Sequence, residues 1–152
     1  MEPKEQKTLE VLERIYRFLL TVKWNKTITY YAHDCFTFGF GMPYSNDFTY
    51  LIQGRKGVNN IPALLGAIGF ACRDKGLPPL CCLVVDQDTK ECGKGVVTSK
   101  EVPEEEKPAF ARDVDRPAAY ACEDYPQPGT QTAADLLDSA MVYLRKEGIV
   151  RE

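Results

Sequence analysis

The sequence predicts a small α+β domain, with amphipathic helices at both ends, a central helix and a short antiparallel sheet. Apolar residues recur every three or four positions in residues 5–23, 61–72 and 132–148, which is the helical period. Apolar runs at 80–85 and 95–99 have the length and β-branched content of strands. The chain has 152 residues, of which 44% are hydrophobic and 27% charged, which is typical of one globular domain spanning residues 1–152.

The first helix carries its apolar stripe on Val11, Ile15, Phe18 and Val22. Asn25 and Lys26 then interrupt the pattern. Residues 27–32 combine β-branched and aromatic side chains, so they fit either a short strand or the start of a second helix.

Residues 36–54 predict a loop with one strand at 48–52, because two Phe-Gly pairs, a Met-Pro step and a Ser-Asn-Asp cluster favour irregular backbone. Asn60 is a suitable N-cap for the central helix, and Pro62 is tolerated in a first helical turn. Gly76 and the two prolines after Leu77 predict where that helix ends.

The run at 80–85 suits a strand that is buried on both faces, and 95–99 can return beside it after a polar hairpin loop. Five prolines in 101–129 predict one short acidic helix and an extended crossing over the core. Thr132 and Asp135 have the spacing of a capping box for the last helix, and Gly148 ends it.

The charge balance argues against a protein that wraps many phosphates. There are 19 Lys and Arg against 22 Asp and Glu, a formal net charge of -3. Bases concentrate in 53–76, whereas 101–124 hold eight acidic against three basic residues. Any contact with nucleic acid is therefore expected to be local.

The cysteines are expected to be reduced thiols in a cytoplasmic protein. The N-terminal residues mix acids and bases, and no apolar run has the length of a signal peptide or a membrane span, so we expect no membrane association. No close Cys or His pair has the spacing of a zinc site, and Gly93-Lys94-Gly95 lacks the rest of a phosphate-binding loop. We expect no metal and no cofactor. The six cysteines are Cys35, Cys72, Cys81, Cys82, Cys92 and Cys122.

The sequence predicts no catalytic residues. The single histidine, His33, stands two residues before Cys35, and thiol catalysis would need the fold to bring a base and a thiol together. A thiol enzyme acting through Cys35 or Cys81 stays an outside alternative to a non-enzymatic role.

The most unusual segment combines rings with polar and basic groups. Six aromatic residues crowd into positions 36–50, and amide and basic side chains follow directly. Rings stack on bases, and guanidinium groups and helix N-termini bind phosphate. The alternative is that these rings fill the core. The expected ligand-binding residues are Tyr44, Phe48, Tyr50, Gln53, Arg55, Lys56, Asn59 and Asn60.

Residues 28–97 resemble the DNA-binding domain of the alkyltransferases and alkyltransferase-like proteins. The resemblance rests on ITYYA, GRKGV, ALLGAIGFAC and LPPLCCLVV in that order, and covers less than half of the chain. It implies a winged-helix-like fold that binds DNA, with Cys81 at the alkyl-accepting position. The histidine and arginine of the family's Pro-Cys-His-Arg-Val-Val box are Cys82 and Leu83 here, so the relay that makes the thiolate is absent.

The expected function is non-enzymatic binding of a nucleotide-type anionic ligand, in the manner of the sequestering proteins that phages encode. The acidic charge favours a compact ligand over a duplex. A winged-helix-like DNA- or RNA-binding protein and a protein-protein interaction module are the alternatives. A homo-oligomer is compatible with each of these.

Overall fold

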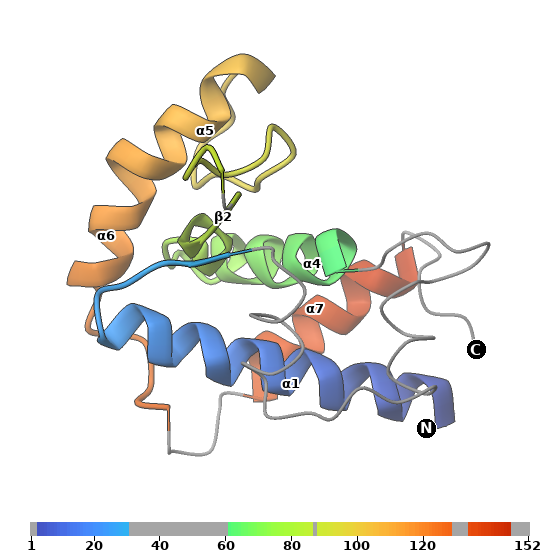
Figure 1. The fold of residues 1–152 in the computed structure, drawn as a ribbon. Coiled ribbons are helices and arrows are strands. Elements are labelled where there is room, and N and C mark those ends of the chain that lie inside the picture. The colour runs from blue at the N-terminus through green and yellow to red at the C-terminus, as the bar shows by residue number, and fades with distance from the viewer. Residues whose placement is uncertain (1–2, 31–60, 87, 129–133, 147–152) are drawn as a thin grey trace.

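The computed structural model describes residues 3–30, 61–86, 88–128 and 134–146 (Figure 1). These residues form a small α+β arrangement of helices with a two-stranded sheet. The elements are α1 (Pro3–Trp24), β1 (Thr29–Tyr30), α4 (Ile61–Asp74), a 3₁₀ turn (Leu80–Leu83), β2 (Val84–Val85), a second 3₁₀ turn (Glu104–Glu106), α5 (Lys107–Phe110), a π-helical segment (Ala111–Asp115), α6 (Arg116–Ala121) and α7 (Ala134–Lys146).

The three long helices enclose the core. In Figure 1, α7 lies between α1 and α4, and the run from Glu104 to Ala121 rises on the other side of the sheet. Leu12, Leu19, Ile68 and Leu144 are completely buried. Each lies on the apolar stripe of its helix, so the predicted terminal and central helices are confirmed. Thr132 and Gly148, the predicted cap and end of the last helix, lie outside the described residues.

Two helices end in the same hydrogen-bonded motif. After α4, Gly76 has φ of 73°, its N–H bonds to Arg73 O at 3.0 Å, and Leu77 N–H bonds to Cys72 O at 2.9 Å. This is the Schellman pattern, in which glycine takes the left-handed position without a Cβ penalty. The same pair of bonds closes α1, but there Lys26 occupies the left-handed position, with φ of 54°.

The sheet is parallel, so the predicted antiparallel pairing was wrong. Thr29 pairs with Val84 and Tyr30 with Val85. Within 80–85 only the last two residues are extended, because Leu80–Leu83 form a 3₁₀ turn that is buried throughout. A continuous apolar run fits either backbone when it is buried on all sides. The expected return strand at 95–99 is turn and irregular backbone, and Val97 O accepts a hydrogen bond from Cys81 Sγ at 3.3 Å.

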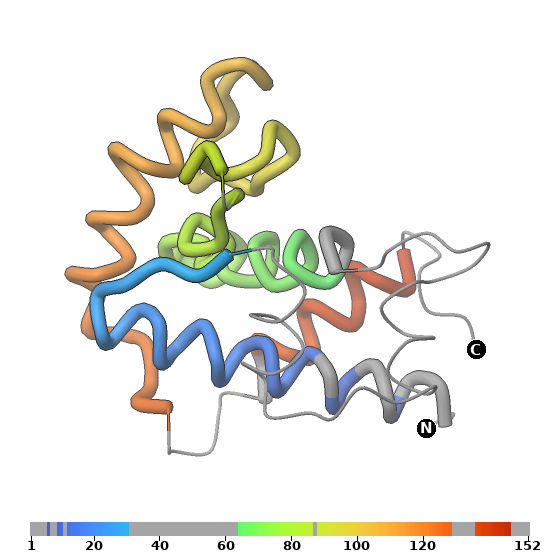
Figure 2. Tube along the Cα trace, viewed as in Figure 1, coloured from blue at the N-terminus to red at the C-terminus, as the bar shows by residue number. Residues whose placement is uncertain are grey.

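Residues 104–121 form a helical arm, which Figure 2 shows as one continuous trace. The sequence predicted one short acidic helix and then an extended crossing, but the helical run extends from Glu104 to Ala121, and only the described residues after it are irregular. Pro108 and Pro117 each stand at the start of an α-helical stretch, and the π-helical segment precedes the second. Proline has no N–H to donate, and both prolines lie where the hydrogen-bond spacing of the arm changes, after the 3₁₀ turn and after the π-helical segment.

The arm and the extended residues after it are fastened to the core by specific hydrogen bonds. The buried carboxylate of Asp115 accepts bonds from Ser99 N and Oγ at 3.0 and 2.5 Å. Tyr125 donates to Pro78 O at 2.5 Å, and Trp24 Nε1 donates to Pro126 O at 2.8 Å. Within the described ranges, none of the helices combines the length and the apolar content that crossing a bilayer would require.

Candidate functional site

The residues that the sequence singled out for ligand binding all fall between 31 and 60, outside the described residues. His33 and Cys35 fall there too. We call residues 31–60 the ring-rich segment. The structure describes the residues on either side of it, Tyr30 and Ile61. The predicted site residues are Tyr44, Phe48, Tyr50, Gln53, Arg55, Lys56, Asn59 and Asn60.

The residue that precedes this segment, Tyr30, lies at the carboxyl edge of the parallel sheet. Because β1 and β2 run in the same direction, the chain leaves both strands at one edge. From β1 it enters the ring-rich segment, and from β2 it enters the loop 86–91. The carboxyl edge of a parallel sheet is where α/β proteins commonly bind ligands, since loops from neighbouring strands meet there.

The loop after β2 is closed by its own hydrogen bonds. Asp86 N–H bonds to Glu91 O at 2.8 Å, and Lys90 N–H bonds to Asp86 O at 2.9 Å. The Asp86 carboxylate accepts the N–H groups of Asp88 and Thr89 at 2.8 and 3.0 Å. These backbone bonds, that from Thr89 first, lower the pKa of Asp86. The Asp86 carboxylate therefore serves as a turn cap.

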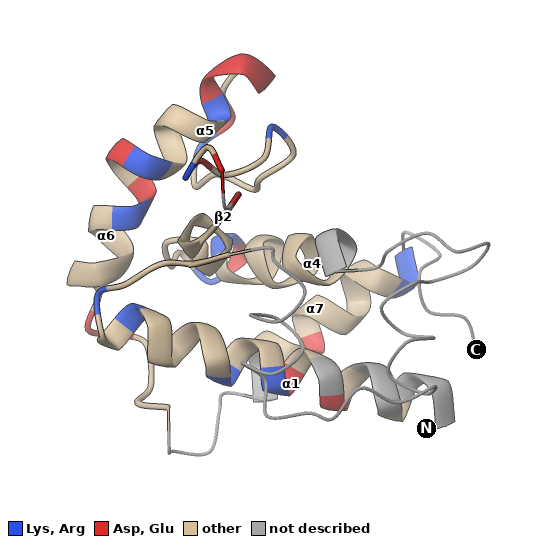
Figure 3. Ribbon diagram, viewed as in Figure 1, with Lys and Arg blue, Asp and Glu red and all other residues tan. Residues whose placement is uncertain are grey.

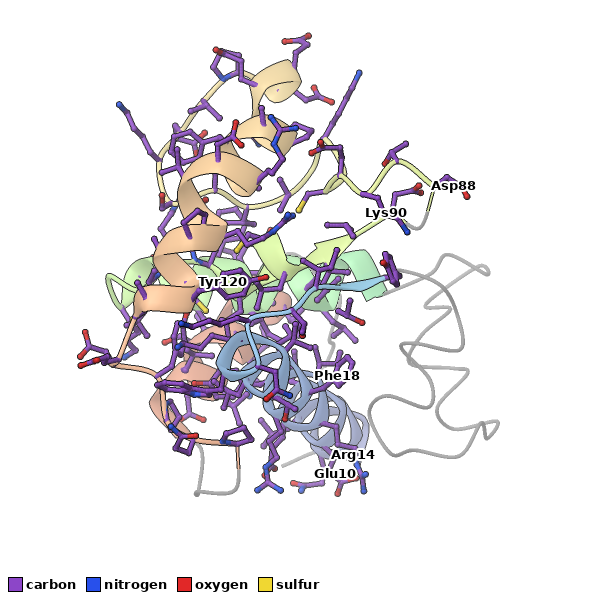
Figure 4. The ribbon with its side chains drawn as sticks, turned by 60° about the vertical axis from the view of Figure 1, so that its left-hand side comes forward. Glu10, Arg14, Phe18, Asp88, Lys90 and Tyr120 are labelled. Carbon is purple, nitrogen blue, oxygen red and sulfur yellow. The ribbon has the colours of Figure 1, made fainter. Side chains whose placement is uncertain are left out.

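Lys90 is turned back onto β1 by this loop. Its φ of 61° is in the left-handed region, and its ammonium lies 4.4 Å from the centroid of the Tyr30 ring. The Lys90 Nζ donates to Tyr30 Oη at 3.3 Å. In Figure 4, Asp88 lies at the outer end of the loop, and Lys90 lies closer to the strands. The Lys90–Tyr30 pair is an exposed cation beside a half-buried ring at the point where the ring-rich segment begins.

The left-handed backbone of Lys90 is a strained conformation that the loop holds in place. A non-glycine residue in a sparsely populated backbone region costs of order 1 to 3 kcal/mol. The bond from Lys90 N–H to Asp86 O, the contact of the ammonium with the Tyr30 ring and the bond from Nζ to Tyr30 Oη offset this cost.

Four buried cysteines, Cys72, Cys81, Cys82 and Cys92, are poor nucleophiles. Cys81 is 4% exposed, and burial is the main cause that raises its pKa. Burial also raises the pKa of Cys72, Cys82 and Cys92, and for Cys92 the nearby Arg116 guanidinium offsets only part of this effect. Because the thiolate is the reactive form, this environment does not favour thiol chemistry at Cys81.

Metal binding has no candidate in the described part of the chain. No group of three or more His, Cys, Asp or Glu side chains there could hold an ion. Two acidic side chains of the loop, those of Asp86 and Glu91, are engaged otherwise. Glu91 Oε1 pairs with Arg112 Nη1 at 2.5 Å, and Asp86 caps its own turn.

Sequence reasoning missed the Lys90–Tyr30 pair. The two residues are 60 positions apart, and they meet because β1 pairs with β2 in parallel. No local pattern links them. In the sequence, Lys90 is distinguished only as a lysine that follows a polar stretch. Lys26 has the same feature, so it does not identify a site.

Comparison with protein-family models, with curated proteins and with solved structures finds no match for this chain. Its function is therefore argued from its own residues and their geometry.

Proposed function

We propose that this chain is a non-enzymatic binding protein for a compact, nucleotide-type anionic ligand, which it sequesters. The observation that carries the proposal is the Lys90 ammonium above the Tyr30 ring, at the carboxyl edge of the parallel sheet. This pair offers a positive charge and an aromatic surface at the start of the ring-rich segment.

The composition of that segment supports the same ligand class. Rings such as Tyr44 and Phe48 can stack on a base, and Arg55 and Lys56 can neutralise phosphate. Lys90 adds a cation from a different part of the chain. The same combination of groups therefore occurs in the sequence of this segment and in the described Lys90–Tyr30 pair.

The charge distribution favours a compact ligand over a duplex. In Figure 3, the ribbon at the tip of the helical arm is coloured red for Asp and Glu, and Glu104, Glu105 and Glu106 are exposed there. A formal net charge of -3 argues against binding a long phosphate backbone by bulk charge. One nucleotide needs only a local cluster of cations.

The proposal is tested by thermal-shift screening of the whole chain against nucleoside mono-, di- and triphosphates and a short DNA duplex. A true ligand at about 100 times its Kd stabilises the folded protein by about 2.7 kcal/mol. Lys90→Met keeps the aliphatic stem over Tyr30 and removes the charge, so we expect about tenfold weaker binding. Lys94→Met removes an exposed charge from the next turn and should leave the Kd within about twofold.

Tyr44→Ala and Arg55→Ala test the ring-rich segment itself. Each is expected to abolish nucleotide binding and to leave the Tm of the free protein nearly unchanged. If both variants unfold, these side chains belong to the core and the site assignment is wrong.

Two outcomes of the screen would reject the proposal. The first is that no nucleotide changes the Tm. The second is that the duplex binds with an affinity that falls steeply as salt rises, which would favour the DNA-binding alternative.

A further inference from the structure

A second, chemically different pocket lies between α4 and the turn that follows Cys92. Its volume is about 270 Å³. Leu65 and Gly66 of α4 form one wall, and Gly95, Val96 and Val97 form the other, with Cys81 between them. The Lys90–Tyr30 pair is not part of its lining.

The described lining of this pocket is apolar and uncharged. Leu65, Val96 and Val97 are between 2% and 8% exposed. The only side-chain polar group is the Cys81 thiol, and it already donates to Val97 O at 3.3 Å. No charged side chain belongs to the described lining, so an ion placed here would lose hydration without gaining an ion pair, which favours a neutral ligand.

Packing against the described residues does not explain the glycine at position 66. Gly66 lies inside a helix, where glycine costs about 1 kcal/mol relative to alanine. A Cβ at this position would meet no described atom within 4 Å. Gly69, one turn later, is different, because a Cβ there would lie 2.8 Å from Cys81 Sγ and 2.9 Å from Val97 Cβ. Gly69 is required by the fold, whereas Gly66 leaves the pocket open.

The pocket is partly open to solvent, and Gly66 on its wall is half-buried, so water can enter it. Its lining is largely apolar, and an apolar ligand that covers it would remove this surface from water. A Cβ at position 66 would meet no described atom within 4 Å and would favour the helix, so helix stability does not account for the glycine.

We propose that this pocket binds a small, neutral, apolar ring compound. Sites for drug-sized ligands measure about 300 to 1,000 Å³, so a pocket of about 270 Å³ suits a single or fused ring of indole size. The proposal is independent of the nucleotide site, because the two linings select opposite ligand chemistry.

The test is an NMR titration of the ¹⁵N-labelled full chain with indole, and with indole-3-carboxylate as the matched charged compound. Indole is expected to shift the amide signals of Gly95, Val96 and Val97 saturably. Indole-3-carboxylate should bind at least tenfold more weakly. The absence of saturable shifts with indole, or equal binding of the two compounds, would overturn the proposal.

Two variants close the pocket from opposite walls. Gly66→Leu should weaken indole binding at least tenfold without lowering the Tm, because the new side chain enters open space. Gly95→Val should do the same from the other wall, where a Cβ also meets nothing within 4 Å. It also provides a test if Gly66→Leu fails to fold. Unchanged indole binding in a folded variant would contradict the assignment.

Gly69→Ala is the variant whose Tm is compared with that of Gly66→Leu. Its methyl group would collide with Cys81 Sγ and Val97 Cβ, so the Tm should fall. A Gly66→Leu variant that loses as much stability as Gly69→Ala would show that Gly66 serves packing, and would remove the argument for a ligand.

Discussion

Lys23 is the most unusual single residue in the core. Its side chain is completely buried, and its Nζ has no hydrogen-bond partner among the described residues. The ammonium lies 3.4 Å from the centroid of the Trp24 ring. Burial is the main cause that lowers its pKa; Lys26 adds to the effect, and Cys122 and Glu123 oppose it. A buried donor without a partner typically costs about 1 to 3 kcal/mol.

Lys23→Met is therefore expected to raise the free energy of unfolding at pH 7 by about 1 kcal/mol. The lysine pKa is lower in the folded protein than in the unfolded chain. The cost of burying the charge is complete below the folded pKa, and it is relieved as the pH rises toward the unfolded value near 10.4.

Urea unfolding of both proteins between pH 6 and pH 10 checks this expectation. The advantage of Lys23→Met should shrink as the pH rises, and the comparison cancels the titration of groups that both proteins share. An advantage that is absent at pH 7, or that grows with pH, would contradict the account of Lys23.

The helical period could have predicted that Lys23 is buried. Leu12, Tyr16, Leu19 and Lys23 follow one another at intervals of three or four, so Lys23 continues the buried stripe of α1. If every charged residue of α1 is assumed to face solvent, the burial of Lys23 is missed. Its lack of a hydrogen-bond partner could not be predicted, because that depends on the residues that cover it.

At the scale of elements, the docking of α7 on α4 should account for much of the stability. Phe70 and Tyr143 bring their ring centroids to 4.7 Å across this contact, and Leu144 is completely buried. Val142, on the opposite face of α7, is 60% exposed. The two faces of one helix therefore differ sharply in burial.

Leu144→Ala is expected to lower the free energy of unfolding by about 2 to 5 kcal/mol, because it leaves a cavity in the core. Val142→Ala is the matched control and should change it by less than about 0.5 kcal/mol. Urea unfolding measures both. Similar losses in the two variants would contradict the docked orientation of α7.

The helices were predictable and the sheet was not. Local apolar periodicity predicts the helices at 5–23, 61–72 and 132–148. The position of Gly76 after the central helix predicts where that helix ends. The pairing of Thr29 with Val84 joins residues 55 positions apart. That pairing depends on how α1 and α4 pack, which no local pattern contains.

At the scale of the whole molecule, buried acids should make the fold sensitive to alkaline pH. Burial is the main cause that raises the pKa of four thiols and two tyrosines: Cys72, Cys81, Cys82, Cys92, Tyr16 and Tyr125. These groups stay protonated in the folded protein after they begin to ionise in the unfolded chain.

The free energy of unfolding is expected to be highest below about pH 8.5, the ordinary thiol value, and to fall above it by about 1.4 kcal/mol per pH unit for each buried thiol. Cys82→Ala should make this fall with pH less steep by the contribution of one buried thiol. Urea unfolding under reducing conditions at pH 7, 8, 9 and 10 provides the data. A stability that stays constant up to pH 10 would show that these thiols are accessible to water.

The candidate site was only partly predictable. Composition alone identified the ring-rich segment, because six aromatic residues and a basic cluster within 25 positions are visible without a fold. Lys90 and Tyr30 became candidates only when the parallel pairing placed the loop 86–91 beside the end of β1.

The most direct test of the proposed function compares two lysines with the same backbone strain. Lys26 and Lys90 both have positive φ, but Lys26 only closes a helix. Lys26→Gly and Lys90→Gly should each relieve strain and raise the free energy of unfolding by about 1 kcal/mol.

Calorimetric titration with the best nucleotide from the screen then separates the two positions. The account predicts that Lys26→Gly binds like the unmodified protein and that Lys90→Gly binds at least tenfold more weakly despite its greater stability. Equal nucleotide affinity in the two variants would contradict the claim that Lys90 is held over Tyr30 to meet an anionic ligand.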